Sequence, residues 1–250
     1  MNDSMAAIDN AGAGLSQVER VVDTYVAPTK TFTDIRRNSS WWLPFLLSVL
    51  VGLAFVYSVD RKIGFDQVAQ ATINRSATTQ QRMSTMSDAQ RESTVQLIAK
   101  TTRISSCATP LFLLIIGLVC AGFLMLSFNL GLGAKASFSQ YLAIWFYASL
   151  PFLIRTLLAA ITIFAGGASD QFDMRNPVGT NIGWYLSSDT PAWVKALLSS
   201  ADLFTIWVVL LLILGCATVT RVKRSSAAIV IIGWWILIIV GTTVTAAFNG

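Results

Sequence analysis

Residues 41–59 read WWLPFLLSVLVGLAFVYSV and carry no charged side chain. A helix needs about 20 largely apolar residues to cross the hydrocarbon core of a bilayer, and tryptophan is enriched where the chain leaves that core. The stretch therefore predicts a transmembrane helix that begins among the lipid headgroups. The composition fits such a chain, because 54% of its 250 residues are hydrophobic and 12% are charged, whereas soluble domains have about 25% charged residues.

Four further apolar stretches are long enough to cross a bilayer. They comprise residues 110–130, 141–165, 203–220 and 227–247. We therefore predict an all-α polytopic membrane protein with a five-helix membrane domain over residues 41–247. Two polar regions complete the organisation. Residues 1–40 are expected to form a cytoplasmic N-terminal amphipathic segment, and residues 60–109 a helical connection on the extracytoplasmic side.

Lysine and arginine predict the orientation, because they are enriched in cytoplasmic segments next to membrane spans. Four basic residues precede the first span, one lies between the second and third, three lie between the fourth and fifth, and none follows the fifth. This pattern predicts a cytoplasmic N-terminus and an extracytoplasmic C-terminus. The 60–109 connection, with seven basic and four acidic residues, weighs the other way, but charge in a long connection has less influence.

The N-terminal segment has helical periodicity. Its apolar stripe consists of Leu15, Val18, Val22 and Tyr25. This stripe predicts one short amphipathic helix, and Pro28 followed by the pair Thr31 and Asp34, which resembles a capping box, predicts a second. We expect both helices to lie on the cytoplasmic face of the membrane; the alternative is a partly disordered tail. No cleavable signal peptide is visible, so the first span is expected to serve as an uncleaved signal anchor.

Four residues between this segment and the first span are candidate interfacial anchors. Arg36 and Arg37 are expected to lie at the anionic lipid surface. Trp41 and Trp42 are expected at the level of the headgroups. Together these four side chains predict where the chain enters the bilayer.

The two long connections differ in composition. In the 60–109 connection, Ser87 followed by Gln90 is typical of a helix start, so we expect two helices with a break around residues 85–87. The connection over residues 166–202 begins with turn-forming residues, and Thr190 before Pro191 predicts a short helix through Leu198. The 60–109 connection is expected to present a solvated outer face, whereas Trp184, Tyr185 and Trp193 of the later connection favour the membrane interface.

Arg155 is the most unusual residue of the predicted spans, because a charge at mid-membrane costs on the order of 3 kcal/mol on insertion scales. We predict that it forms an intramembrane polar pair with Asp202, with Asp170 and Asp173 as alternative partners. Asp202 also suits the N-cap of the fourth span. Arg155 is therefore interpreted as part of a structural ion pair or as a snorkelling anchor, with binding of a transported anion as the alternative.

Other chemistry is not indicated. The chain has no histidine, and the spacing of Cys107, Cys120 and Cys216 fits no metal-binding motif. The stretch GLGAKAS at 131–137 lacks the spacing of a phosphate-binding loop and is better interpreted as a tight turn. We expect no catalytic residue, no cofactor and no metal, and therefore no enzyme. Nucleic acid is not expected as a partner, because the basic residues are scattered around apolar stretches.

Several motifs, in order along the chain, resemble a known family. They are APTKTFTDI (27–35) before WWLPFLL, FSQYLAIWFYASLP (138–151), NPVGTN (176–181), SSADLFTIWVVLLLILG (199–215) and VKRSSAAIVIIGWW (222–235). Over residues 15–247 the chain resembles the bacterial branch of the Yip family, the Ypt-interacting membrane proteins. The resemblance implies a five-span membrane protein with a cytoplasmic N-terminus, here in a bacterial cytoplasmic (inner) membrane. Eukaryotic relatives that bind Rab-class GTPases have an acidic, aromatic, Gly-Pro motif in the cytoplasmic segment, which this sequence lacks.

The resemblance and the residues together lead to a functional expectation. We expect a non-enzymatic integral membrane protein that acts as a scaffold or adaptor in membrane organisation or trafficking. Its expected partners are the lipid bilayer and either another protein or a second copy of the chain. The alternative is a small transporter or channel subunit with an intramembrane site at Arg155.

Overall fold

The computed structural model describes residues 14–74, 77–166, 172–174, 176–187 and 189–249. The regular structure within these ranges is helical, without a strand. Five helical stretches are long and apolar enough to cross a membrane: Trp42–Lys62, Thr109–Leu130, Phe138–Phe164, Leu203–Thr220 and Arg224–Phe248. The predicted all-α polytopic fold is confirmed, and the protein is an integral, multi-pass membrane protein.

The chain divides into two compact units. The first unit contains the described chain up to Leu47 together with Leu114–Pro151 and Val208–Ile232. The second unit contains Ser48–Leu113, Phe152–Trp207 and the described chain from Gly233 onward.

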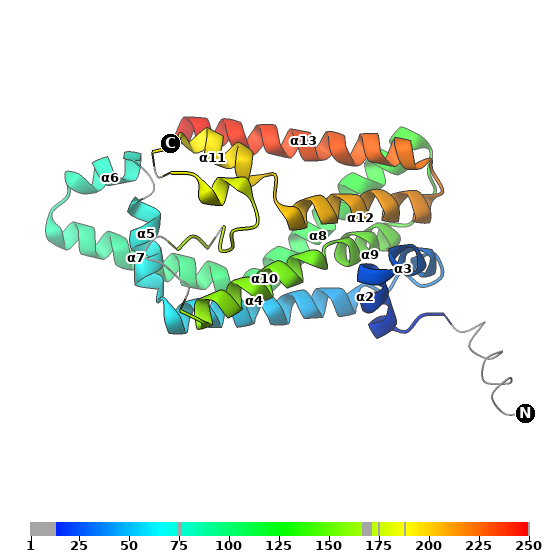
Figure 1. Ribbon diagram of the computed structural model, residues 1–250, viewed down its shortest axis with the longest axis horizontal. Helices are drawn as coiled ribbons and strands as arrows, with labels where there is room; N and C mark the ends of the chain where they lie inside the picture. Colours follow the sequence, from blue (N-terminus) through cyan, green and yellow to red (C-terminus); the bar gives the residue numbers. More distant parts are fainter. Residues whose placement is uncertain (1–13, 75–76, 167–171, 175, 188, 250) are drawn as a thin grey trace, which may run out of the picture. The chain divides into compact units, whose positions relative to one another are not determined.

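The first unit contains a helical hairpin made of α2 (Gln17–Val26) and α3 (Pro28–Ile35), which lies beside α9 (Phe138–Ala148) (Figure 1). It also contains stretches of α4 (Trp42–Lys62), α8 (Thr109–Met125), α12 (Leu203–Thr220) and α13 (Arg224–Asn249), and the π-helix η1 (Leu126–Leu130). Fully buried side chains of this unit include Phe32, Ile35, Phe128, Tyr141 and Ile144. The hairpin therefore contributes to the core of the unit.

The third apolar stretch, predicted as one span over 141–165, is divided into α9 and α10 (Pro151–Phe164). The break falls at Ser149 and Leu150. Proline has no backbone N–H to donate to the carbonyl four residues earlier, and its ring crowds that carbonyl. Pro151 thus ends α9, and its fixed φ suits it to begin α10.

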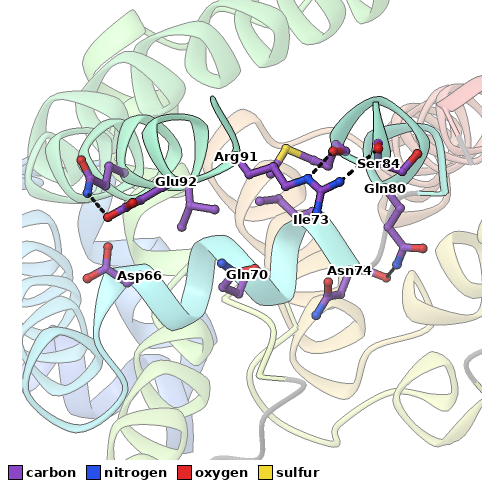
Figure 2. A pocket seen from close by; sticks show the side chains of 11 residues that line it. Asp66, Gln70, Ile73, Asn74, Gln80, Ser84, Arg91 and Glu92 are labelled. Atoms are coloured by element: carbon purple, nitrogen blue, oxygen red, sulfur yellow. Dashed lines mark hydrogen bonds between the residues drawn. The ribbon is translucent and has the colours of Figure 1, made fainter. Parts of the chain in front are cut away.

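The second unit contains three helices between the first two spans, where the sequence analysis predicted two. These are α5 (Phe65–Asn74), α6 (Ala77–Ser84) and α7 (Asp88–Cys107). The expected break around residues 85–87 is present, and Ser87 and Gln90 form a capping box at the start of α7. The extra division separates α5 from α6. The three helices surround an open hollow (Figure 2).

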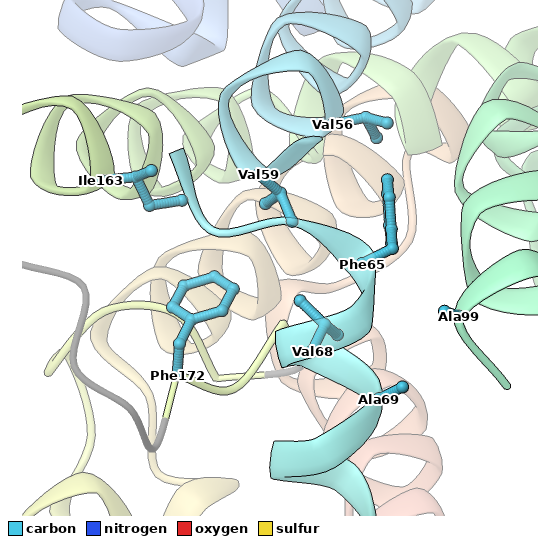
Figure 3. Close-up of a cluster of buried hydrophobic side chains, with 8 residues drawn as sticks. All are labelled: Val56, Val59, Phe65, Val68, Ala69, Ala99, Ile163 and Phe172. Atoms are coloured by element: carbon cyan, nitrogen blue, oxygen red, sulfur yellow. The ribbon is translucent and has the colours of Figure 1, made fainter. Parts of the chain in front are cut away.

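A hydrophobic cluster in the second unit holds this connection together. It consists of Val56, Val59, Phe65, Val68, Ala69, Ala99, Ile163 and Phe172 (Figure 3). Its members come from the ends of α4 and α10, from α5 and α7, and from the chain after α10. The connection between the first two spans is therefore packed on an apolar core that it shares with the ends of α4 and α10. The later connection contains the 3₁₀-helix η2 (Ile182–Tyr185) and α11 (Ala192–Ser199).

Several basic residues of the 60–109 connection have partners within the second unit. The guanidinium of Arg103 lies 3.2 Å from an oxygen of Asp60. Arg61 lies over the ring of Tyr57 at 5.5 Å, and Lys62 over that of Phe164 at 5.4 Å. The positive charge that weighed against the predicted orientation thus has a local structural role.

Candidate functional site

The α2–α3 hairpin begins with a capping box that the sequence analysis missed. The Ser16 hydroxyl accepts from the backbone N–H of Glu19 at 3.2 Å, and the Glu19 carboxylate accepts from the N–H of Ser16 at 2.7 Å. These hydrogen bonds lower the pKa of Glu19. The capping box predicted at Thr31 and Asp34 is wrong, because α3 begins earlier, at Pro28. Proline suits that position, where a backbone N–H is not needed.

The two helices of the hairpin are joined by an ion pair between Arg20 and Asp34. Arg20 is fully buried, its Nε donates to Asp34 Oδ2 at 2.6 Å, and a terminal nitrogen lies 2.5 Å from the same oxygen. The other terminal nitrogen donates to the carbonyl of Asn38 at 2.7 Å. Arg37 holds the second oxygen of Asp34 at 3.0 Å. One carboxylate therefore bridges two guanidinium groups.

The charge state of Asp34 follows from this arrangement. Partial burial alone would raise the pKa of the carboxyl. The hydrogen bonds from Arg37 and Arg20 and the positive charges of both outweigh burial, so the pKa is lowered from its ordinary value of 3.8. Asp34 is therefore an anion at neutral pH, as the buried Arg20 requires.

The side of α2 that faces the protein is polar. The backbone carbonyl of Arg20 accepts from the hydroxyls of Thr24 and Thr31, at 2.7 and 2.9 Å, and both threonines are buried. Two tyrosines then connect α2 to the third span. Tyr147 donates to the Gln17 side chain at 2.9 Å, and Tyr25 donates to the carbonyl of Leu150 at 2.8 Å.

The outer face of α2 is apolar. Val18, Val22 and Val26 follow one another at intervals of four residues and are 65%, 53% and 74% exposed. The predicted amphipathic helix is present, but its polar side faces the protein and its valines face outward. Burial of the Tyr25 phenol against the third span raises its pKa to about 12.

The four predicted interfacial anchors have different environments. The Trp41 ring stacks on that of Phe146 with centroids 5.3 Å apart, whereas Trp42 is exposed. Arg37 is tied to Asp34, whereas Arg36 is exposed. The structure therefore places Trp41 and Arg37 in contacts within the first unit and leaves Trp42 and Arg36 facing outward.

The structure brings the predicted polar pair together in the second unit. The Nε of Arg155 lies 3.7 Å from Oδ2 of Asp202, and their side chains are 25% and 5% exposed. The Thr180 hydroxyl donates to the same carboxylate oxygen. Of the alternative partners, Asp170 lies outside the described residues, and a contact of Asp173 with Arg155 stays a prediction.

Asp202 is also the N-cap of the fourth span. Its Oδ1 accepts from the backbone N–H groups of Phe204 and Thr205 at 3.0 and 3.2 Å. The backbone N–H of Leu203 donates to the carbonyl of Thr180 at 3.2 Å. The Asp202 carboxylate thus pairs with Arg155 and also caps α12. Through these contacts it ties the connection before the fourth span to α10 and α12.

The hollow between α5, α6 and α7 has a volume of about 910 Å³. Arg91 crosses it and donates to the carbonyls of Met83 and Ser84 at 2.8 and 3.0 Å (Figure 2). This guanidinium therefore satisfies carbonyl groups at the end of α6, where the helix itself supplies no donors. Asp66 and Glu92 also line the hollow.

Arg20 is the central residue that the sequence analysis did not identify as a site. A signal for it exists, because Arg20 and Asp34 lie at equal distances from Ala27, next to the helix-starting Pro28. Two short helices that fold back at that point bring these positions together. Metal ligands show no such grouping: within the described residues, no three His, Cys, Asp or Glu side chains could hold an ion.

Comparison with known proteins gives one match. The family model described as the Yip1 domain matches residues 22–245. No curated protein and no solved structure matches the chain. The matched range begins within α2 and ends within α13, so it covers the second half of α2, all of α3, the first four candidate spans and most of the fifth.

Proposed function

This chain belongs to the Yip1 domain family, and on that basis we propose that it is a non-enzymatic scaffold or adaptor of membrane organisation or trafficking. We place it in a bacterial cytoplasmic membrane, with its N-terminus on the cytoplasmic side. The observation that supports this role is the α2–α3 hairpin, which is fastened to the third span by its polar face and presents an apolar face outward.

The contacts of the hairpin indicate its depth. Gln17 and Tyr25, near the two ends of α2, bond to Tyr147 and Leu150, which lie close to the middle of the candidate span Phe138–Phe164. In contrast, the Ser39 hydroxyl pairs with that of Ser139, at the start of the same span. On this basis α2 lies beside the first half of the span, within one leaflet, and not on the membrane surface as the sequence suggested.

We assign the acyl chains of that leaflet as the occupant of the valine face. Burying a valine side chain away from water is worth roughly 1.5–3 kcal/mol, and three valines in one line form a continuous apolar stripe. Arg20 and Thr24 of α2 are buried, and the guanidinium is neutralised by Asp34, whereas the charged Glu19 in the first turn of the helix stays exposed. A helix held in one leaflet in this way displaces lipid on that side only, which is a physical basis for organising a membrane.

Photo-crosslinking from the valine face tests this assignment. A photoreactive residue replaces Val22 in the full chain in its native membrane, and a matched chain carries it at the exposed Thr33 of α3. A higher yield of lipid adducts from position 22 than from position 33 supports the membrane scaffold role. Adducts with a separate protein support the adaptor role and assign the face to that protein. If the photoreactive groups at positions 22 and 33 both react mainly with water and give equally few adducts, the proposal is overturned.

Co-purification in mild detergent provides the functional measurement. The variant Val18→Ser, Val22→Ser, Val26→Ser should insert normally and lose any component that wild type retains in constant ratio. Deleting the whole N-terminal segment is a less specific test, because Phe32 and Ile35 belong to the core of the first unit. If the triple variant retains the same components as wild type, the valine face of α2 does not bind the partner.

The grouping of segments supports the proposed orientation. The first unit contains the N-terminal segment, the 131–137 connection and the 221–223 turn, which alternate crossing of five spans puts on one side. The second unit contains both long connections and the described end of the chain. The positive-inside tendency then assigns the first group to the cytoplasm.

A second candidate function, a small transporter or channel subunit, is supported by the Arg155–Asp202 pair. Charged groups within membrane spans are costly and often mark ion pathways. In this protein Asp202 already has three kinds of contact, to Arg155, to Thr180 and to the start of α12. That environment favours a structural link over an exchangeable site.

A flux measurement separates the two functions. Wild type in proteoliposomes should show no transport of inorganic ions or small organic anions above protein-free vesicles if the scaffold proposal holds. A flux that Arg155→Leu abolishes and Arg155→Lys partly retains would instead establish the transport function.

A further inference from the structure

Three basic residues from separate segments of the first unit line one hollow of about 350 Å³. Arg36 follows α3, Lys135 belongs to the 131–137 connection, and Arg221 follows α12. The other lining residues are Gln140, Val219 and Thr220. None of the three cations has an ion pair within the described parts of the chain. The hollow therefore gathers three positive charges for which the described residues supply no counter-ion.

The backbone next to Lys135 is held in place by a partly buried hydrogen-bond network. Asn129, in the π-helix η1, donates to the carbonyl of Ala136 at 2.8 Å and accepts from its N–H at 3.3 Å. The Tyr141 hydroxyl donates to the same Asn129 oxygen at 2.7 Å. A π-helical turn is uncommon and is often found at functional sites. In this case it directs Asn129 to the loop that carries Lys135.

Gln140 fixes the second segment. Its amide nitrogen donates to the carbonyl of Arg36 at 3.5 Å, and its oxygen accepts from the backbone N–H of Ser137 at 2.9 Å. The end of α3 is thereby tied to the start of α9. Two of the three cations thus stand on backbone positions that named side chains hold.

Arg221 stands on a strained backbone position. Its φ is +60°, and it is the one residue other than glycine with a positive φ among those described. It follows the last residue of α12, a position where glycine is the common choice because its lack of a Cβ removes the strain. An arginine at this position accepts an unfavourable backbone conformation and supplies a guanidinium to the hollow.

We propose that this hollow binds a phosphate group. A guanidinium presents a planar pair of N–H donors that matches two phosphate oxygens, and a lysine adds a point charge. Arg36 and Arg221 supply the guanidinium groups and Lys135 the ammonium. The phosphate can belong to the headgroup of an anionic lipid or to a free phosphate solute. The site is independent of the valine face and of the scaffold role.

The experiment uses the purified full chain and two probes. Phosphatidic acid is titrated against the protein in detergent and compared with phosphatidylcholine by native mass spectrometry. Inorganic phosphate is titrated calorimetrically into the protein in phosphatidylcholine nanodiscs. We expect saturable, one-to-one binding of at least one phosphate probe. Binding of the lipid alone assigns the phosphate to a headgroup, and binding of inorganic phosphate assigns it to a solute.

The variants separate binding from folding. Arg221→Gly removes the charge and relieves the backbone strain. It should therefore raise the Tm of the protein and lower its affinity for the phosphate probe about tenfold or more. Lys135→Gln should weaken binding to a similar degree. The matched control is Lys223→Gln, which removes an exposed cation of the same turn that does not line the hollow, and should change binding less than about twofold.

Two results would overturn the proposal. One is an absence of saturable binding of either probe. The other is equal weakening by Lys223→Gln, Lys135→Gln and Arg221→Gly, which diffuse attraction of anions to a basic membrane surface would produce. Neither result bears on the valine face, so this inference and the proposed function can fail separately.

Discussion

Arg20 and Asp34 lie on facing sides of the hairpin turn at Ala27, and the fully buried guanidinium of one contacts the carboxylate of the other at 2.5 Å. Removing one partner of a buried pair leaves an uncompensated charge and typically costs about 3–5 kcal/mol. This relationship makes the hairpin sensitive to single substitutions at either position and less sensitive to their combination.

We expect Asp34→Ala to be the more damaging of the two single changes, because it leaves Arg20 buried without its anion. In Arg20→Met, the carboxylate keeps Arg37 and is partly exposed. The double variant should lose less stability than the sum of the single variants. Thermal unfolding in detergent, with limited proteolysis of residues 14–38, measures all three. Additive losses would show that the two side chains are not coupled.

Acid should loosen the hairpin. The pKa of Asp34 is lowered in the folded protein, so the unfolded segment binds more protons as the pH falls. The stabilisation is therefore complete above the ordinary carboxyl pKa of 3.8 and declines as the pH falls below it. The protection of α2 and α3 against hydrogen exchange, corrected for the intrinsic exchange rate at each pH, should fall as the pH drops below 3.8. In Asp34→Asn this protection should already be low at about pH 5 and show little further dependence.

Gly215 is a contact point between α12 and the hairpin. A Cβ at this position would lie 2.7 Å from Cε1 of Phe32 and 3.0 Å from Cγ2 of Ile144. Because Phe32 is fully buried, Gly215→Ala should overpack the site and cost about 1–3 kcal/mol. Gly122→Ala is the control, since nothing lies within 4 Å of its added Cβ. That variant should gain up to about 1 kcal/mol of helix propensity, so the two Tm values should move in opposite directions.

Two substitutions at Asp202 separate its roles. Asparagine retains an oxygen that can accept from the N–H groups of Phe204 and Thr205, but it removes the charge that faces Arg155. Alanine removes both, and loss of an N-cap costs about 1 kcal/mol. Asp202→Ala should therefore have a lower Tm in detergent than Asp202→Asn, and Asp202→Asn a lower Tm than wild type. Equal Tm values for the two variants would show that the cap adds nothing.

Cys107 reports on orientation. Its thiol is exposed at the end of α7, whereas Cys216 is buried. A membrane-impermeant maleimide added to intact cells should label wild type, and Cys107→Ser should remove that label. In a Cys107→Ser background, Lys223→Cys should be labelled only after the membrane is permeabilised. Labelling of Lys223→Cys in intact cells, with protection of Cys107, would reverse the proposed topology.

Apolar length and composition were sufficient to predict the five spans. The division of the third span was missed, although Pro151 is visible in the sequence, because proline in the first turn of a helix and proline between two helices share one local signal. The packing of α2 could not be predicted for a different reason. Its valine stripe indicated an amphipathic helix, but periodicity alone does not show whether protein or lipid covers the apolar side.

The two ion pairs also differ in how far the sequence could predict them. Arg155 and Asp202 could be singled out because a charge is rare inside an apolar stretch. Arg20 and Asp34 lie in a segment where charges are common, so nothing in their immediate neighbours marks them. Their proximity depends on a turn at Ala27, and that turn becomes informative only once both short helices are known. The basic hollow depends on three segments far apart in the chain, which no local pattern connects.

The Arg20–Asp34 pair also has a consequence for biosynthesis. Residues 14–38 are translated before the five candidate spans, and the segments that receive the hairpin, α9 and α12, are translated much later. A guanidinium cannot enter lipid or a protein core until its charge is matched. The pair joins residues only fourteen positions apart, so it can close while the hairpin still lies in water. The hairpin is thus translated well before the segments that receive it, and its internal pairing is the step that makes its late packing possible.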